Sequence, residues 1–133
     1  MTPRLQWNPD YTVGSDSLDD QHRQILAQCN ALADCMDETS EAGRAEFDRR
    51  FQALMALAQE HFATEEALLT GSGYPALEEH QNERDEFGYL ADNIVKTEHF
   101  ERSELQRFLA LWWVGHIVGS GTKHRPFLQQ GAR

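Results

Sequence analysis

Residues 47–69 read FDRRFQALMALAQEHFATEEALL. Apolar side chains recur there at alternating intervals of three and four residues, which is the period of a helix that buries one face. The predicted inward face consists of Phe47, Phe51, Leu54, Ala58, His61, Glu65 and Leu68. A histidine and a carboxylate therefore interrupt an apolar stripe, and because they lie four residues apart they project from the same side of the helix.

Outward from this stretch, capping residues, glycines and prolines divide the chain. We predict helices over residues 17–38, 40–69, 75–97 and 103–118. Ser17 with Asp20 is a capping pair for the first helix, and Thr39 or Ser40 caps the second. The end signals are Gly71, Gly73, Gly119 and Gly121, with Pro75 in the first turn of the third helix and Pro126 beginning a short tail.

Four helices with short connections favour an all-α fold, an antiparallel up-down-up-down four-helix bundle. Residues 1–16 contain two prolines and scattered aromatic residues, so we expect an extended N-terminal arm whose aromatics lie against the bundle. A chain of 133 residues has the length of one ordinary domain, and the expected organisation is a single domain over residues 1–133.

Every predicted inward stripe contains one histidine. The other three stripes are Leu18, His22, Ile25, Cys29, Leu32, Met36 in the first helix; Leu77, His80, Arg84, Phe87, Ala91, Ile94 in the third; and Leu105, Leu109, Trp112, His116 in the fourth. In an antiparallel bundle the four histidines fall at one depth. Burying several imidazoles and a carboxylate without partners costs several kcal/mol, whereas a metal ion uses these groups as ligands. The predicted metal ligands are His22, His61, Glu65, His80 and His116.

Composition excludes several function classes. Lysine and arginine number 12 against 22 acidic residues, a net charge of −10, which disfavours nucleic acid and anionic membrane surfaces as partners. No apolar run reaches the roughly 20 residues of a membrane span, and the first residues lack the apolar stretch of a secretory signal. Cys29 and Cys35 are too far apart on one helix for a disulfide, so we expect a reducing, cytoplasmic location.

The motifs together resemble the hemerythrin-like proteins, specifically the bacterial single-domain hemerythrins, over nearly the whole chain. They are Trp7, Tyr11 and Val13-Gly14, then LDDQH at 18–22, HFATEE at 61–66, GYP at 73–75 with His80, and WWVGHI at 112–117. This resemblance implies a non-haem di-iron site that binds O2 reversibly, for oxygen carriage, storage or sensing. It further implies that His22 and His61 serve the iron with the open O2 position, and that His80 and His116 serve the other.

Two positions depart from the family's seven ligands, which are five histidines and two bridging carboxylates. The resemblance places a histidine at the position of Arg84 and an aspartate at that of Gly121. Arginine has no lone pair to offer a metal, and glycine has no side chain. Three outcomes remain open: a single metal held by two histidines and Glu65, an altered pair of metals, or no functional metal. One option is that Arg84 replaces the second cation electrostatically by pairing with Glu65 or a nearby carboxylate; another is that Glu83, three residues after His80, serves as a replacement ligand.

The expected function is a metal-binding protein with an altered non-haem iron site that binds or senses O2 or another diatomic gas. The enzyme alternative is a mononuclear non-haem iron oxidase or peroxidase-like activity, which we disfavour because no general acid or organic-substrate recognition set is evident. A metal-free interaction module is the third reading. His99 and His124 fall outside the stripes and are expected to face solvent, and Asp19 is expected to cap its helix or to accept a hydrogen bond from a ligand imidazole.

Overall fold

The computed structural model describes residues 5–35, 40–96 and 101–131 of the chain. Four long helices form most of the fold: α1 (Asp16–Asp34), α2 (Glu41–Gly71), α3 (Leu77–Lys96) and α4 (Arg102–Lys123). A 3-10 turn, η1 (Pro9–Tyr11), precedes α1, and a short helix, α5 (Arg125–Gly131), follows α4. The described residues contain no strand.

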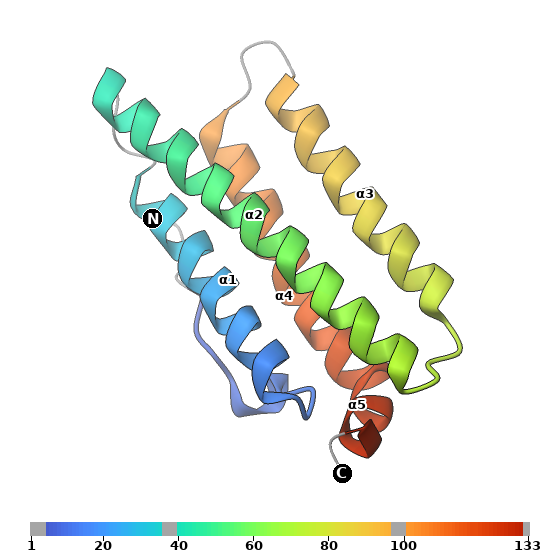
Figure 1. The fold of residues 1–133 in the computed structure, drawn as a ribbon. Helices are drawn as coiled ribbons and strands as arrows, with labels where there is room; N and C mark the ends of the chain where they lie inside the picture. Colours follow the sequence, from blue (N-terminus) through green and yellow to red (C-terminus); the bar gives the residue numbers. More distant parts are fainter. Residues whose placement is uncertain (1–4, 36–39, 97–100, 132–133) are drawn as a thin grey trace.

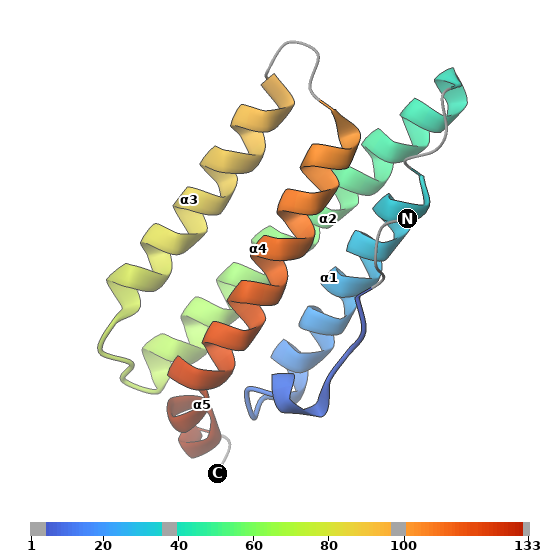
Figure 2. The ribbon, with the colours of Figure 1, turned by 180° about the vertical axis from the view of Figure 1, so that it is seen from behind.

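Consecutive long helices run in opposite directions, and each of α2 and α4 packs against both α1 and α3 (Figure 1). Seen from behind, α4 lies at the front, between α3 and α1 (Figure 2). The predicted antiparallel four-helix bundle is therefore confirmed. Its topology brings the start of α1, the end of α2, the start of α3 and the end of α4 to one end of the bundle, where α5 also lies.

The predicted helix starts agree with the structure to within about two residues. Ser40 caps α2, since its hydroxyl accepts a hydrogen bond from the Gly43 N–H at 3.1 Å. The cap of α1 is Ser15 rather than Ser17, and its hydroxyl accepts from the Leu18 N–H at 3.4 Å. Helix α1 ends at Asp34; the predicted extension over 36–38 lies outside the described residues. Helix α3 starts at Leu77, two residues after Pro75.

The prediction that α4 ends at residue 118 is wrong, because the helix continues through Gly119 and Gly121 to Lys123. Glycine lowers helix propensity by about 1 kcal/mol, which neighbouring packing readily offsets. Pro126 does not begin an irregular tail either. It occupies the first turn of α5, where a missing N–H is tolerated, and α5 packs against α2 and α4.

Two apolar clusters fill the bundle. The larger one contains Ile25, Cys29, Leu32, Phe47, Phe51, Leu54, Ala58, Phe62, Phe87, Leu105, Leu109 and Trp113. The smaller one, at the end near α5, contains Val13, Leu18, Leu69 and Leu128. Two stripe assignments need correction by one residue. Leu69 is buried whereas Leu68 is 37% exposed, and Trp113 is fully buried whereas Trp112 is half-buried.

The N-terminal arm lies against the bundle, as predicted. The backbone of Leu5 exchanges two hydrogen bonds of 2.8 Å with the side-chain amide of Asn30, and Val13 is fully buried. Asp19 holds the arm to α1, because its carboxylate accepts hydrogen bonds from the Thr12 hydroxyl and from the Val13 N–H. The expectation that Asp19 supports a ligand imidazole is therefore wrong.

Two further expectations concern sulfur and membranes. Cys29 on α1 and Cys35 directly after its end are both free thiols, as their separation predicts. Burial raises the pKa of the Cys29 thiol to about 12, so it packs as a small apolar group.

Among the described residues, no helix has the length and apolar character needed to cross a membrane.

Candidate metal centre

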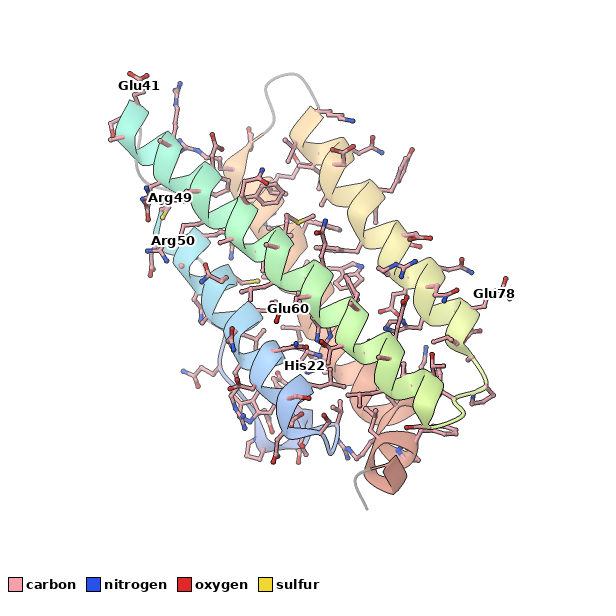
Figure 3. All side chains as sticks on the ribbon, in the orientation of Figure 1. His22, Glu41, Arg49, Arg50, Glu60 and Glu78 are labelled. Atoms are coloured by element: carbon pink, nitrogen blue, oxygen red, sulfur yellow. The ribbon has the colours of Figure 1, made fainter. Side chains whose placement is uncertain are left out.

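Polar side chains meet in a layer between the two apolar clusters. His22 lies between Leu18 and Ile25 on α1, and it is fully buried. Figure 3 shows His22 among the side chains that fill the bundle, whereas Glu41, Glu60 and Glu78 stand on its outside. The other predicted ligands are also less than 4% exposed: His61, Glu65, His80 and His116. The stripe argument thus placed all five side chains in the interior.

Four of these five side chains converge closely. Potential ligand atoms of His22, His61, Glu65 and His116 all lie within 4.8 Å of one another, in the only such buried group among the described residues. The Nε2 atom of His61 lies at the centre, 3.1 Å from Nε2 of His22 and 3.2 Å from Nε2 of His116. A single hydrogen on Nε2 of His61 cannot form hydrogen bonds to both neighbouring nitrogens at once. Three imidazole nitrogens this close together are typical of the ligands of one cation.

Glu65 faces the histidines with both oxygens. Its Oε2 lies 3.0 Å from Nε2 of His61 and 3.9 Å from Nε2 of His22. Its Oε1 contacts Nε2 of His80 and lies 3.5 Å from Nε2 of His116. Although fully buried, Oε2 has no hydrogen-bond partner, so a cation beside it would satisfy an oxygen atom that is otherwise left without a donor. His80 joins the layer through this carboxylate and is not part of the compact group of four.

The outer nitrogen of His61 has a fixed partner. Nδ1 of His61 lies 3.0 Å from Oε1 of Gln21, whose amide nitrogen donates to the Thr64 hydroxyl at 3.1 Å. The Thr64 hydroxyl donates in turn to the Glu60 carbonyl at 2.9 Å. Because this chain orients the Gln21 amide, the proton of a neutral His61 lies on Nδ1 and the lone pair on Nε2 points into the cluster.

His116 has a corresponding arrangement with a carboxylate. Its Nδ1 lies 3.0 Å from Oε1 of Glu83, so Nδ1 donates and Nε2 faces His61 and Glu65. The ring is stacked on Trp112 with a centroid separation of 5.2 Å and an interplanar angle of 9°. A carboxylate on the outer nitrogen and an aromatic ring beside it fix the orientation that a metal ligand needs.

This position of Glu83 corrects the idea that Glu83 is a replacement ligand. Its described contact is with the outer nitrogen of His116, and its pKa is lowered mainly by that hydrogen bond. Its side chain is 42% exposed, whereas the cluster is buried. Glu83 therefore contacts the outer nitrogen of a candidate ligand and lies outside the compact group of four.

Arg84 points away from the cluster. Its guanidinium contacts the carboxylate of Glu66 and lies 3.2 Å from Oδ1 of Asp85, and its side chain is 36% exposed. The expectation that Arg84 pairs with a nearby carboxylate is met by Glu66, and the described contacts of the guanidinium do not include Glu65. Gly121 lies on α4 between His116 and the end of the helix.

The side chains of the layer differ sharply in their protonation states. Burial lowers the pKa of His22 to about 2, with further lowering by His61 and His116, and burial also lowers the pKa of His61. Burial opposes charge on His116 too, but Glu65 and Glu83 raise its pKa to about 9. Burial opposes charge on Glu65, but His116, His61 and His80 hold its pKa well below its usual range. In the metal-free protein, Glu65 and His116 thus form a charged pair, and the imidazoles of His22 and His61 are neutral.

His124 is the histidine whose burial the stripe analysis predicted wrongly. It is 4% exposed rather than solvated, and burial lowers its pKa to about 4. Its ring lies 5.7 Å from that of His80 and 4.9 Å from that of Tyr74, measured between centroids. The error follows from ending α4 too early, since the continued helix and α5 carry His124 back against the bundle. His99 lies outside the described residues.

Comparison with known proteins identifies the family. The model of the Hemerythrin HHE cation binding domain matches residues 13–119. The chain belongs to the hemerythrin family. It is 30% identical to a bacteriohemerythrin of Stenotrophomonas maltophilia, covering 86% of this chain and 75% of that protein. A bacteriohemerythrin of Methylococcus capsulatus is 29% identical, over 83% and 85% of the two chains. A hemerythrin-like protein of Naegleria gruberi is 26% identical over 93% of both. No solved structure matches significantly.

Family membership and the buried cluster agree on a cation-binding domain. The matched region spans α1 to most of α4 and so contains every side chain of the cluster. The donor set of three imidazoles and one carboxylate suits a divalent transition metal such as iron or zinc.

Proposed function

We propose that this hemerythrin-family protein holds non-haem iron in the cluster of His22, His61, Glu65 and His116, and that it binds or senses O2 or another diatomic gas. The observation that carries the proposal is the orientation of two ligand rings. Gln21 and Glu83 each accept from the outer nitrogen of a histidine, which leaves the inner nitrogens of His61 and His116 directed at Glu65. Iron supplies the redox chemistry and the gas-binding position.

The donor set explains why iron is the metal we favour. Three imidazoles and one carboxylate leave open coordination positions on a metal that prefers five or six ligands. The sequence resemblance already implies two histidines and Glu65 on the iron with the open position. The cluster geometry supports adding His116 to that set, since its Nε2 lies 3.2 Å from that of His61.

The surroundings favour a small ligand over an organic substrate. Phe62 packs against the rings of His61 and His116 at centroid distances of 5.7 Å. Phe62 also lines a cavity of about 330 Å³ whose lining residues come from α2 and α3. We infer that a diatomic molecule reaches the cluster past this ring, while larger molecules stop at it. This reading makes the protein a binding protein and not an enzyme.

We further propose that Arg84 and Gly121 stand where the family has ligands, so that the family's pair of metals is altered here. Arg84 faces Glu66 and solvent, and glycine brings no donor. The two ligands that this chain lacks belong to the side of the site near His80. The compact group of four keeps all its side chains. One iron in that group is therefore the core of the proposal.

The test is metal analysis followed by reversible gas binding. Protein from iron-supplemented cells should contain at least one iron per chain. Its reduced form should change its visible spectrum on exposure to O2 and recover when O2 is removed under argon. Absence of bound iron, or irreversible oxidation with steady turnover of peroxide and an electron donor, would overturn the binding function in favour of a metal-free module or an enzyme, respectively.

A further inference from the structure

The cavity that Phe62 lines, called the α2–α3 cavity below, has walls from two helices that pack side by side (Figure 1). Its volume is about 330 Å³. Three of its lining residues are exposed, namely Gln59, Asp85 and Tyr89. Ala58 and Phe62, which also line it, are buried. The cavity therefore leads from the surface of the bundle to a buried aromatic ring.

Gly88 keeps the α2–α3 cavity open on the side of α3. It lines the cavity directly after the buried Phe87, and a Cβ atom placed on it would meet no heavy atom within 4 Å outside its own helix. Glycine costs the interior of a helix about 1 kcal/mol relative to alanine, so helix propensity gives no reason for it here. A longer side chain at this position has room to fill the cavity.

Phe62 connects the α2–α3 cavity with the compact group of four. Its ring packs against the rings of His61 and His116 at centroid distances of 5.7 Å. It also stacks on the fully buried Trp113 at 5.4 Å. One aromatic side chain thus contacts both the cavity and two of the four candidate ligands.

The lining of the α2–α3 cavity suits an uncharged, apolar occupant. Its charged groups are already paired, since the Arg84 guanidinium contacts Glu66 and lies 3.2 Å from Oδ1 of Asp85. Met55 and Phe87 add to the apolar part of the wall. Apolar cavities bind small apolar molecules such as xenon, and a diatomic gas shares this lack of charge.

We propose that the α2–α3 cavity is a docking site for small apolar gas molecules, separate from the metal centre, and that Gly88 keeps it open. The proposal rests on the proposed function, because it takes the cluster beyond Phe62 as the destination of the gas. A docking site on the route belongs to neither end state of the cluster. Closing it raises one barrier, so gas binding and gas release slow by the same factor while the affinity is unchanged.

The first experiment uses metal-free protein and xenon. Met55 lines the cavity, so the carbon-13 resonance of its methyl group reports an occupant. Xenon dissolved under pressure should shift this resonance in the wild type, and Gly88→Leu should abolish the shift. Ala56→Leu is the matched control, since Ala56 is exposed on α2 and does not line the cavity. The control should keep the shift of the wild type.

The second experiment measures O2 binding and release in iron-loaded protein by stopped flow. Gly88→Leu should slow both rates several-fold and by the same factor, with the equilibrium affinity unchanged, and Ala56→Leu should match the wild type. Unchanged rates in Gly88→Leu would overturn the route through the cavity. A changed affinity would place the effect of residue 88 on the cluster itself and overturn the proposal as well.

The xenon result separates this proposal from the proposed function. No xenon-dependent shift in the wild type, or a shift retained in Gly88→Leu, would overturn the docking site whatever metal the protein holds. A xenon shift in protein that binds no iron would overturn the proposed function and leave the docking site standing. If Gly88→Leu does not fold by circular dichroism, the smaller Gly88→Ala replaces it and should weaken xenon binding; binding equal to that of the wild type would refute the role of Gly88.

Discussion

The Oε1 atom of Glu83 lies 3.0 Å from Nδ1 of His116, so a carboxylate on α3 orients an imidazole on α4. The opposite nitrogen of that ring faces His61 and Glu65. Gln21 on α1 makes the corresponding contact with His61 on α2 at 3.0 Å. The residues around the cluster thus direct the inner ring nitrogens of His61 and His116 at one point, and this orientation distinguishes the layer from a set of histidines that merely pack.

Exchange of Glu83 for glutamine tests this orientation. Glu83→Gln should weaken metal binding by about 10–100-fold, because the outer partner of a ligand imidazole raises its basicity and fixes its ring. Glu86→Gln is the matched control on the same helix, since Glu86 is exposed, and its affinity should equal that of the wild type. Competition with a chromophoric chelator measures both. Equal affinities for the two variants would mean that Glu83 has no part in the centre.

Two adjacent glutamates give a sharper comparison. Glu65 is fully buried in the cluster, whereas the side chain of Glu66 is 22% exposed and contacts Arg84. Glu65→Gln should weaken metal binding by more than about 100-fold, beyond the usual effect of a group that only orients ligands. Glu66→Gln should change it by less than about tenfold. Loss of metal in Glu66→Gln alone would place the cation at the bundle surface.

Metal binding should release a proton whose source is His116. In the metal-free protein its pKa is raised to about 9, so the ring is charged at pH 7 and must lose a proton to become a ligand. The pKa of His22 is lowered to about 2 and Glu65 is already ionised, so neither contributes. Calorimetry in buffers of different ionisation enthalpy should give about one proton per metal at pH 7.

The pH dependence of this release has a definite sign. The proton count should fall toward zero as the pH rises through about 9, because His116 is then neutral before the metal arrives. The apparent affinity should increase from pH 7 to pH 9 for the same reason. A proton count that does not change over this range would show that His116 is not a ligand.

The two departures from the family pattern can be reversed together. Arg84→His with Gly121→Asp supplies an imidazole and a carboxylate on the side of His80, and iron content should rise to two per chain. Charge-transfer bands of a bridged pair should strengthen in air. In the wild type, the Arg84 guanidinium contacts Glu66, so its replacement also removes this ion pair. A folded double variant that binds no more iron than the wild type would show that these two positions do not limit the site.

The fold and the five buried side chains were accessible from sequence because they depend on helical periodicity. Apolar residues at intervals of three and four fix the inward face of each helix, and the antiparallel order fixes the common depth. His22 and His61 illustrate the result: they lie far apart in the chain, yet their Nε2 atoms are 3.1 Å apart.

The orienting contacts were not accessible in the same way. Gln21 and Glu83 are each one residue off the inward stripe, where periodicity predicts only a helix flank, and their partners on α2 and α4 depend on how the helices are rotated. His124 was missed because glycines were read as the end of α4. Helix α4, 22 residues long, passes Gly119 and Gly121 and packs against α1, α3 and α5, which local helix propensity does not register.

The central claim is that a metal binds among His22, His61, Glu65 and His116. Crystals of iron-loaded protein measured on both sides of the iron absorption edge test it most directly. The account predicts an anomalous difference peak at bonding distance from Nε2 of His61 and a carboxylate oxygen of Glu65, at about 2.0–2.2 Å. Iron peaks confined to surface carboxylates, with the four side chains closed on one another, would contradict it.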